Sequence, residues 1–558
     1  MKKQLLSAAL VALLAAPAFA QNSDADDQPS DAKEIVVTGT RTQEVGGVQT
    51  PDTSKAKAVL TQETVTVYGD YDVDGTTAVA LMAEQLAELG LECSYYIPDR
   101  YREGYGVSAA GIDYTIAAGY DLLITLDCGI KAHTQLARAH EAQIDIIVCD
   151  HHQPDSTLPP GIILNPKQAA CAYPYAELSG CGVAFKLLQG LYQFLQRDEQ
   201  QLFKSLDLVA LAIGADIVEL LGENRVLCAR GLTQLNTAPR PAFLAILALA
   251  SKSLPLSLRD IVFVLAPRIN AAGRIASGKR AVDWMLSTDQ KEIEALAIEI
   301  NTDNTTRRAL DQENTAQALA QIASDPKFDI QFTTVVYDPN WHKGVVGIVA
   351  SRLKERFNRP AIIFAPDGNT GEELRGSGRS LTGFHLRDAL DIVSKKEPGL
   401  ILKFGGHAMA AGLTIRKNDF DRFDACFQEV ANSLLSEELL ERQHIHDGAL
   451  QVSEFTPEIG DLLADEIWGQ GFPQPIFYGE FEIAEQSLMK EKHLRLLVKP
   501  LDSESNSAPT KPLTAVWFNR TQSLPSKAKL AYRLVTDRYQ GQARVQLMIE
   551  AHDESSST

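Results

Sequence analysis

Three apolar, strand-like runs of the chain are each followed by acidic side chains. The runs, with the first carboxylate after each, are Thr64–Tyr68 with Asp70, Leu122–Leu126 with Asp127, and Ile144–Cys149 with Asp150. In open parallel sheets, ligands bind beyond the carboxyl ends of the strands, so these side chains are expected at one edge of one sheet. The sequence therefore predicts an α/β domain with a polar site at that edge.

Further polar side chains accompany these carboxylates. Asp72 and Asp74 follow in the turn after the first run, and His151 and His152 come directly after the third carboxylate. Residues 78–89 then have the apolar spacing of a helix, which places the aspartate-rich turn between a strand and a helix.

A fourth apolar run, Leu208–Ile213, is either a strand or the end of a buried helix, and it leads to Asp216. Collecting so many carboxylates without cations is strongly unfavourable, because a buried unpaired charge is costly. Hard divalent cations that share an aspartate would neutralise them, and mixed carboxylate and imidazole ligation suits Mn²⁺ or Mg²⁺. The candidate ligands of two such ions are Asp70, Asp72, Asp74, Asp127, His151 and Asp216.

Each motif also has a plainer explanation. The spacing of Asp70, Asp72 and Asp74 matches the first half of an EF-hand calcium loop, but Leu81 stands where that loop needs a bidentate glutamate. Asp150 could serve only as a helix cap, and a single histidine is more often a core residue than a ligand. Two adjacent histidines directly after a buried strand favour the metal site.

The combined motifs resemble those of a known family. The segments Gly69–Gly75, Leu126–Gly129, Asp150–His152 and Ala215–Asp216 are similar to the successive motifs of the DHH phosphoesterase superfamily. The segments that resemble its RecJ branch, the single-strand-specific DNA exonucleases, are Pro267–Arg274, Trp341–Gly347, Gly376–Ser380 and Phe404–Ala408. The resemblance runs from about residue 58 to the C-terminus.

The resemblance implies four parts after the N-terminal segment. They are a parallel-sheet DHH domain at residues 58–287, a connecting helix at 288–327, a second α/β lobe (DHHA1) at 328–432, and an OB-like β-barrel at 446–551. Five short β-type runs between Phe477 and Glu550 independently predict the barrel, which is a common module for binding single-stranded nucleic acid.

The resemblance also implies hydrolysis of phosphodiester bonds by two metal ions, which lie about 3.5–4 Å apart and bracket the scissile phosphate. The expected ligands are Asp127 as the bridge, Asp70 and Asp72 on one ion, and Asp74, His151 and Asp216 on the other. The expected catalytic residues are Asp127, Asp150 and His152, of which His152 contacts the substrate phosphate.

The formal net charge of −19 excludes binding of nucleic acid through the overall field of the protein. Any contact with DNA must come from a local positive groove. Glycine-rich turns beside basic side chains offer the N–H groups and the charge that phosphate binding needs. The expected substrate-binding residues are Arg268, Asn270, Arg274, His342, Lys343, Ser377, Arg379, Gly405, Gly406 and His407.

The activity that the resemblance implies is 5′-to-3′ hydrolysis of single-stranded DNA to mononucleotides, in DNA repair and recombination. Two alternatives are a DHH-type phosphodiesterase for small nucleotides or oligoribonucleotides, and a non-catalytic DNA-binding scaffold of the same fold. We expect a monomer without membrane contact, with single-stranded DNA as its partner. A single-strand-binding protein and repair helicases are the candidate protein partners.

The first 57 residues differ in character from the rest. Lys2, Lys3 and the apolar stretch Leu5–Ala16 follow the order of a secretory signal peptide with cleavage after Ala20, and residues 21–57 are expected to be disordered. Glu34–Arg41 resembles the TonB-box region of TonB-dependent outer-membrane receptors. The seven cysteines form no Cys-x-x-Cys pair, which favours a reducing compartment. We therefore expect the enzyme to work in the cytoplasm, although the leader reads as an export signal.

Overall fold

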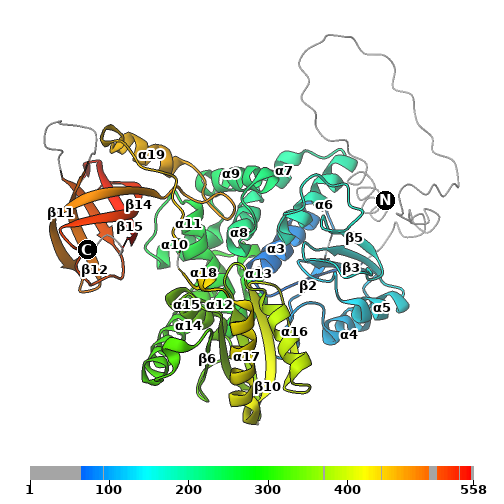
Figure 1. Cartoon of the computed structure of the whole chain (residues 1–558). Coiled ribbons are helices and arrows are strands. Elements are labelled where there is room, and N and C mark those ends of the chain that lie inside the picture. Colours follow the sequence, from blue (N-terminus) through cyan, green and yellow to red (C-terminus); the bar gives the residue numbers. More distant parts are fainter. Residues whose placement is uncertain are drawn as a thin grey trace. The chain divides into compact units, whose positions relative to one another are not determined.

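The computed structural model describes residues 64–91, 93–368, 371–441, 443–501, 512–538 and 541–553. The signal-peptide-like leader and the receptor-like segment lie outside the described residues. The chain divides into two compact units, whose elements are labelled in Figure 1. The first unit ends at Thr305 and also contains Gly469–Phe472, and the second contains Thr306–Trp468 and the chain from Pro473 onward.

The first unit is built on a parallel sheet with the strand order β2-β1-β3-β4-β5. Its strands are β1 (Val65–Gly69), β2 (Cys93–Tyr96), β3 (Leu122–Leu126), β4 (Asp145–Cys149) and β5 (Ile162–Leu164). β1 and β3 are buried along their whole length, as expected for strands inside a sheet that is covered on both faces. The predicted parallel α/β domain is confirmed. β2 and β5 are additional short strands, whose residues are only half-buried.

Helices pack around this sheet. They are α3 (Val73–Glu88), α4 (Ala109–Ala117), α5 (His133–Glu141), α6 (Gly180–Phe194), α7 (Glu199–Phe203), α8 (Leu206–Asp216), α9 (Gly222–Thr237), α10 (Pro241–Leu249), α11 (Leu258–Asp260), α12 (Ala266–Ile275) and α13 (Lys279–Leu286). A π-helical turn, Ile261–Leu265, joins α11 to α12. Within the described ranges, no helix has both the length and the apolar character needed to cross a membrane.

The run Leu208–Ile213 lies within helix α8, so its interpretation as a strand is wrong and its interpretation as a buried helix end is correct. Every residue from Leu206 to Ile213 is buried, and α8 packs against α3, α6 and α9. A helix that is apolar on all sides belongs to the core, and a short apolar run does not distinguish it from a strand. Asp216 therefore projects from the end of a core helix.

The second unit begins within a continuous helix, α14 (Gln290–Ser324), where a connecting helix is predicted. A mixed sheet follows, with the strand order β6-β7-β8-β10-β9. Its strands are β6 (Thr334–Tyr337), β7 (Ala361–Asp367), β8 (Glu373–Arg379), β9 (Ile401–Gly406) and β10 (Ala410–Arg416). β6 is parallel to β7, and the other neighbours are antiparallel. The helices of this lobe are α15 (Val346–Phe357), α16 (Leu386–Lys396), α17 (Phe420–Leu434) and α18 (Glu437–Leu440).

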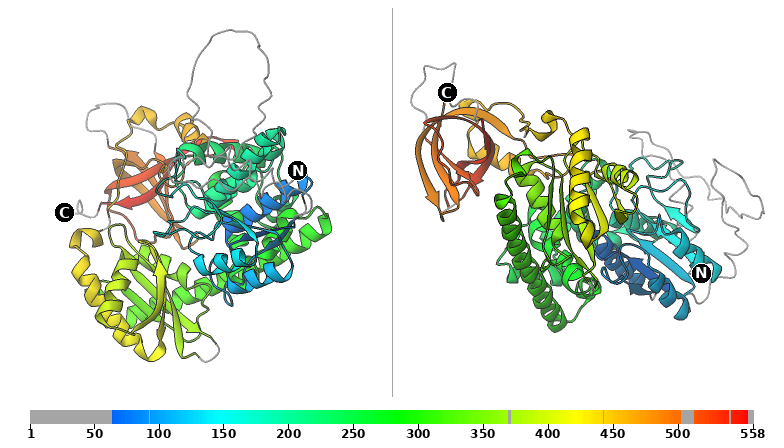
Figure 2. Two further views of the ribbon diagram at one scale, coloured as in Figure 1. Left: turned by 90° about the vertical axis from the view of Figure 1, so that its right-hand side faces the viewer. Right: turned by 60° about the horizontal axis from the view of Figure 1, so that its bottom comes forward.

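The C-terminal part of the second unit is a closed barrel with the strand order β11-β12-β13-β15-β14, drawn in orange to red in Figure 2. Its strands are β11 (Phe477–Met489), β12 (His493–Pro500), β13 (Leu513–Trp517), β14 (Lys527–Asp537) and β15 (Arg544–His552). Phe481, Leu496, Tyr532 and Leu547 are buried in its core, and α19 (Pro457–Asp465) packs against β14. The predicted OB-like barrel is confirmed, since each predicted β-type run falls on one of these strands.

Candidate metal centre

Asp127 occupies a strained position directly after β3. Its φ of 58° lies in the left-handed region, which costs about 1–3 kcal/mol for a residue other than glycine. Its N–H donates to the Cys149 carbonyl oxygen at 2.9 Å. A Cβ at Gly180 would lie 2.6 Å from the Asp127 Cβ, so only glycine fits beside this carboxylate. Oδ1 of Asp127 is buried and has no hydrogen-bond partner among the described residues.

The three aspartates of the first motif have three different environments. Both carboxylate oxygens of Asp70 are buried and have no hydrogen-bond partner in the part of the chain that the structure describes. The Asp72 carboxylate caps α3 by accepting a hydrogen bond from the N–H of Gly75 at 3.1 Å. The Asp74 carboxylate accepts hydrogen bonds from the first two N–H groups of α6, at 2.6 and 2.7 Å. A helix N-terminus favours a negative charge, so α6 holds this carboxylate in place.

His151 lies at the centre of the cluster. Its Nε2 atom is 3.2 Å from Oδ1 of Asp127, 3.5 Å from Oδ2 of Asp216 and 3.8 Å from Oδ2 of Asp74. Neither ring nitrogen has a hydrogen-bond partner within the described ranges. The ends of β3, β4 and α8 and the start of α3 thus converge on one imidazole.

His152 is held by two residues. Its Nδ1 atom is 2.8 Å from Oδ1 of Asp150, and the same oxygen accepts the backbone N–H groups of both histidines. The other Asp150 oxygen accepts the N–H of Ile130 at 3.0 Å. The hydroxyl of Tyr105 lies 3.0 Å from Nε2 and 3.3 Å from Nδ1 of His152. The Asp150 carboxylate is therefore occupied in orienting the histidine pair.

Burial controls the ionisation of this cluster. It raises the pKa of Asp70 and of Asp127 well above the usual range, and neighbouring carboxylate charges raise both further. Burial, reinforced by the charge of Asp72, raises the pKa of Asp74 to about 7. Burial lowers the pKa of His151 to about 3, so its imidazole is neutral at neutral pH. Neutral imidazole is the form that binds a metal ion.

The cluster offers two overlapping sets of metal-ligating atoms. The sets are Asp127, His151 and His152, and Asp74, His151 and Asp216, and the ligand atoms of each set lie within 4.8 Å of one another. Buried polar atoms are normally hydrogen-bonded, yet the oxygens of Asp70, Oδ1 of Asp127 and the ring nitrogens of His151 are not. The donor set fits hard divalent cations such as Mn²⁺ or Mg²⁺, because it combines carboxylate oxygens with a neutral imidazole.

Most of the predicted ligands meet in these sets. Those present are Asp74, Asp127, His151 and Asp216. The structure adds His152, for which the sequence predicts a phosphate contact instead. Asp70 and Asp72 fall outside both sets: Asp70 has buried oxygens without partners, and Asp72 caps α3.

Tyr105 is absent from the predicted site, although its hydroxyl approaches His152 and lies 3.4 Å from the carbonyl oxygen of Asp127. The flanking residues Gly104 and Gly106 adopt positive φ values of 90° and 80°. A tyrosine between two glycines is the only sequence signal for this position, and the same pattern is common in ordinary turns.

Helix α12 carries three predicted substrate-binding residues, which are Arg268, Asn270 and Arg274. A Cβ at Gly273 would lie 2.5 Å from the Tyr71 carbonyl oxygen, so α12 packs directly against the first motif. Arg268 donates from Nε to Oδ1 of Asn301 at 3.0 Å and from Nη1 to the Val264 carbonyl oxygen at 2.6 Å. These bonds brace α12 against α14 and against the preceding turn.

The other predicted substrate-binding residues lie in the second unit. Arg379 donates from Nη1 to Oγ of Ser377 at 3.2 Å. A Cβ at Gly347, in the first turn of α15, would lie 2.9 Å from that Oγ and 3.1 Å from Nη2 of Arg379. A helix N-terminus beside a guanidinium and a hydroxyl is suited to bind an anion. Lys343 instead forms an ion pair with Asp367, with 2.9 Å between nitrogen and oxygen.

The remaining predicted residues of this unit lie in turns or at the strand end directly before a turn. His342 accepts the N–H of Gly344 at its Nδ1 atom at 3.1 Å. The backbone N–H of His407 donates to the Ala410 carbonyl oxygen at 2.8 Å in the β9–β10 turn, and Gly405 and Gly406 are the last two residues of β9, directly before that turn. Ala410 is the register partner of Arg379, so this turn lies beside the guanidinium-bearing end of β8.

Three family models match the chain in succession. They are the DHH family, N-terminal domain, at residues 64–213, the DHHA1 domain at 329–433, and the RecJ OB domain at 446–551. Similar proteins include the single-stranded-DNA-specific exonuclease RecJ of Salmonella typhimurium, which is 38% identical over 507 residues, 87% of this chain and 86% of the relative. The protein of the same name from Escherichia coli is 38% identical over 509 residues, again 87% and 86% of the two chains.

Solved structures extend the similarity to the fold. The crystal structure of RecJ from Thermus thermophilus in complex with Mn²⁺ has a TM-score of 0.75 at 28% identity and covers 88% of this chain and 69% of that one. A crystal structure of exonuclease RecJ bound to manganese has a TM-score of 0.58 at 33% identity, with coverage of 68% and 92%. These similarities, together with the consecutive DHH, DHHA1 and RecJ OB matches, show that the chain belongs to the RecJ family of DHH proteins.

Proposed function

We propose that this protein hydrolyses single-stranded DNA from its 5′ end, in a metal-dependent reaction that releases mononucleotides. The observation that carries the proposal is the buried cluster around His151, whose Nε2 atom lies 3.2 Å, 3.5 Å and 3.8 Å from carboxylate oxygens of Asp127, Asp216 and Asp74. Relatives named exonuclease RecJ, and RecJ crystals that contain manganese, support the same reaction. The polarity and the role in DNA repair and recombination rest on family membership.

In this proposal, two divalent ions are held by Asp70, Asp74, Asp127, His151 and Asp216, with Asp127 shared between them. Such ions, when bound, supply Lewis-acid chemistry by lowering the pKa of a water molecule and stabilising charge on a leaving oxygen. The fold positions these ligands before a metal ion binds. Asp74 is fixed by the N-terminus of α6, and Asp127 is fixed by its left-handed backbone, so little reorganisation is needed on binding.

His152 is proposed to contact the scissile phosphate. Burial lowers the pKa of His152, but the hydrogen bond to Asp150 and the charge of Asp150 outweigh burial and raise it. The imidazole is therefore more readily protonated, and a protonated imidazole attracts a phosphate oxygen. Nδ1 faces Asp150, so we propose that Nε2, which lies 3.0 Å from the Tyr105 hydroxyl, is the atom that contacts the substrate. We assign Asp150 to positioning, in place of the catalytic role that the sequence predicts.

The second unit is proposed to bind the DNA backbone at Ser377, Arg379 and the first turn of α15. The N–H groups of the helix and the fork of the guanidinium match the geometry of a phosphate. Because the net charge of the protein is −19, DNA must bind at a local positive site, and this anion site would be one.

The barrel is proposed to bind a downstream part of the strand. Phe518 follows β13, is 47% exposed, and packs edge-on against the ring of His493, with centroids 4.9 Å apart. OB folds bind single strands on the face of their second and third strands, and aromatic side chains there stack on bases. β12 and β13 are those strands in this barrel.

We propose a reducing compartment, the cytoplasm, for the enzyme. Cys128 and Cys149 are buried thiols next to Asp127 and Asp150, where oxidation would disturb the metal ligands. A single-strand-binding protein and repair helicases are the proposed partners of a monomeric enzyme.

The test is cleavage of end-labelled single-stranded DNA with Mn²⁺ or Mg²⁺. The wild type should release a 5′ label as a mononucleotide, faster from single strands than from duplex. Asp127→Ala should abolish release, whereas Glu141→Ala, at an exposed position on α5, should retain it. Undiminished cleavage by Asp127→Ala would refute the proposed site. Faster cleavage of dinucleotides than of long strands would favour the small-nucleotide alternative, and binding without cleavage would favour the scaffold.

A further inference from the structure

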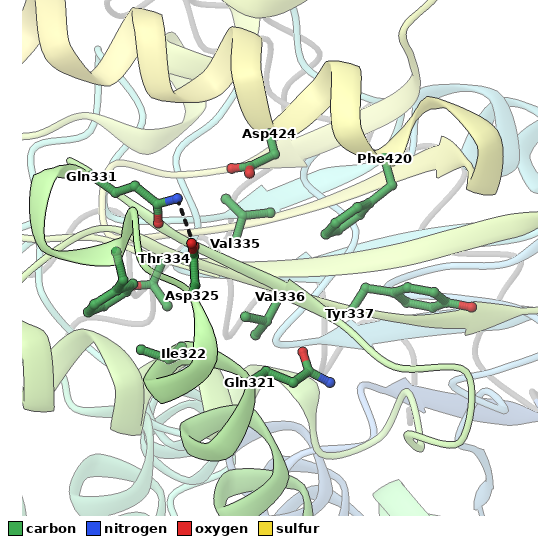
Figure 3. A pocket seen from close by; sticks show the side chains of 11 residues that line it. Gln321, Ile322, Asp325, Gln331, Thr334, Val335, Val336, Tyr337, Phe420 and Asp424 are labelled. Atoms are coloured by element: carbon green, nitrogen blue, oxygen red, sulfur yellow. Dashed lines mark hydrogen bonds between the residues drawn. The ribbon is translucent and has the colours of Figure 1, made fainter.

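The second unit contains a groove that has no part in the proposed nuclease chemistry. It has a volume of about 200 Å³ and lies between the C-terminal end of α14, strand β6 and the start of α17. Figure 3 shows Phe420 and Asp424 projecting from α17 on one side, Ile322 and Gln321 from α14 on the other, and the β6 side chains between them.

The floor of the groove is an open strand edge. β6 is the first strand of the sheet order and pairs only with β7 among the described strands. The N–H of Thr334 donates to the Pro360 carbonyl oxygen at 2.9 Å, toward β7. Because peptide groups alternate along a strand, those of Val335 and Tyr337 point away from β7. An unpaired edge of this kind is a template on which another extended segment can add a strand.

One end of the groove is negatively charged. Asp424 has a buried Oδ1 atom without a hydrogen-bond partner among the described residues. Burial raises the pKa of Asp424 to about 6; the charges of Asp325 and Asp421 add to this rise, and a hydrogen bond to the Gln428 side chain opposes it. Asp325 is itself oriented, because its Oδ2 atom accepts the side-chain amide of Gln331 at 3.1 Å. A cation is the group that would relieve this repulsion.

The other walls of the groove are apolar. The rings of Tyr337 and Phe420 lie 5.7 Å apart, and Val335 and Ile322 also line the cavity. An apolar channel that ends at carboxylates matches a side chain with an aliphatic stem and a charged head, which describes lysine and arginine. The volume is below the ~300–1,000 Å³ of typical small-molecule sites, so one long side chain suits it better than a larger ligand.

We propose that this groove binds an extended, basic segment of a partner protein, which adds a strand to the free edge of β6 and inserts a lysine or arginine side chain between Asp325 and Asp424. The carboxylates would repel the phosphates of DNA, so the groove is a protein-docking site rather than an extension of the substrate path. The proposal is independent of the nuclease activity, because none of these residues belongs to the metal centre or to the Ser377–Arg379 anion site.

The experiment measures binding of labelled seven-residue peptides to the full chain by fluorescence anisotropy. The peptides alternate threonine and valine, have blocked ends, and carry arginine, lysine, norleucine or glutamate at the centre. We expect the arginine and lysine peptides to bind at least ten times more tightly than the norleucine peptide, and the glutamate peptide to bind most weakly. N-methylation of the peptide backbone should remove binding, because it blocks strand pairing.

Two variants of the protein locate the site. Asp424→Asn keeps the shape of the side chain and should reduce the affinity for the arginine peptide about tenfold, while Glu373→Gln, at an exposed position on β8, should not change it. Nuclease activity should be the same in Asp424→Asn as in the wild type. Equal binding of the arginine and norleucine peptides, unchanged affinity in Asp424→Asn, or displacement of the peptide by single-stranded DNA would each overturn the proposal.

Discussion

The Nε2 atom of His151 lies 3.2 Å from Oδ1 of Asp127, and both atoms are buried without a hydrogen-bond partner among the described residues. The two residues follow neighbouring parallel strands, β4 and β3, so the sheet register sets this distance. Burial lowers the pKa of the imidazole and raises that of the carboxyl, so it opposes the formation of an ion pair between the two side chains. A bound cation would satisfy both atoms, so metal binding should add to the stability of the fold.

Manganese should therefore stabilise the wild type against heat. A ligand that binds only the folded state adds about 2.7 kcal/mol when its concentration is 100 times Kd. Asp127→Asn should lose most of the rise in melting temperature that Mn²⁺ gives the wild type, since it removes a charged ligand at nearly constant volume. Differential scanning fluorimetry with Mn²⁺ and with EDTA measures both. An equal Mn²⁺-dependent shift in the two proteins would show that the ions bind elsewhere.

Gly180→Ala should damage the metal centre from the side of helix α6. The new Cβ would lie 2.6 Å from the Cβ of Asp127 and 2.7 Å from its Oδ1 atom. We expect a loss of about 1–3 kcal/mol in unfolding free energy from the overpacking, together with weaker Mn²⁺ binding in calorimetry. Gly182→Ala is the matched control, because its Cβ would meet its nearest neighbour at 3.4 Å. Equal Mn²⁺ affinity in the two variants would contradict the close approach at Asp127.

Asp150→Asn tests the positioning of His152. Loss of a residue that orients a metal-site side chain typically lowers activity about 10–100-fold, and we expect the loss in kcat rather than in KM. The charge of Asp150 raises the pKa of His152. His152 should therefore lose its proton at a lower pH in the variant than in the wild type. The alkaline limb of the kcat profile should therefore move to lower pH. An unchanged profile with reduced activity would indicate that Asp150 acts only through the fold.

Asp424→Asn should stabilise the second unit in a pH-dependent way. The fold raises the pKa of Asp424 from 3.8 to about 6, so this carboxyl favours folding while it is protonated. Its contribution is complete below the unfolded value and is lost as the pH rises through the folded one. The unfolding free energy of the variant should thus exceed that of the wild type by on the order of 1–3 kcal/mol at pH 8 and by roughly half as much at pH 5, because pH 5 lies between the unfolded and the folded pKa values. Urea unfolding at both pH values measures the difference, and a gain that is equal at both would contradict the raised pKa.

Much of the fold follows from local patterns in the sequence. The buried strands β1, β3 and β4 are continuous apolar runs that end at carboxylates, and the barrel strands show the short β-type runs expected of them. Strand β2 has Ser94 among its apolar residues, and strand β5, although apolar, is only three residues long. The run before Asp216 is ambiguous in sequence, because a fully buried helix and a buried strand have the same composition. Only its packing against other helices decides between them.

The metal-ligating residues are easier to predict from the sequence than the contacts that hold them in place. Asp74, Asp127 and His151 are recognisable because each follows or adjoins a strand end. The N–H groups of α6 that hold Asp74 are more than a hundred residues away in the chain. A local sequence pattern cannot predict such a contact. The sequence does not indicate a role for Tyr105 for the same reason, since only the folded loop brings its hydroxyl to His152.

We expect the carboxylates and the imidazole of the cluster around His151 to hold divalent ions. The most direct measurement is the anomalous scattering of crystals of the full chain grown with Mn²⁺. We expect manganese peaks in contact with Asp127 and His151, and the loss of those peaks in Asp127→Asn crystals grown under the same conditions. Crystals without manganese at this cluster, with the His151 ring nitrogens bonded to protein groups or to water instead, would contradict it.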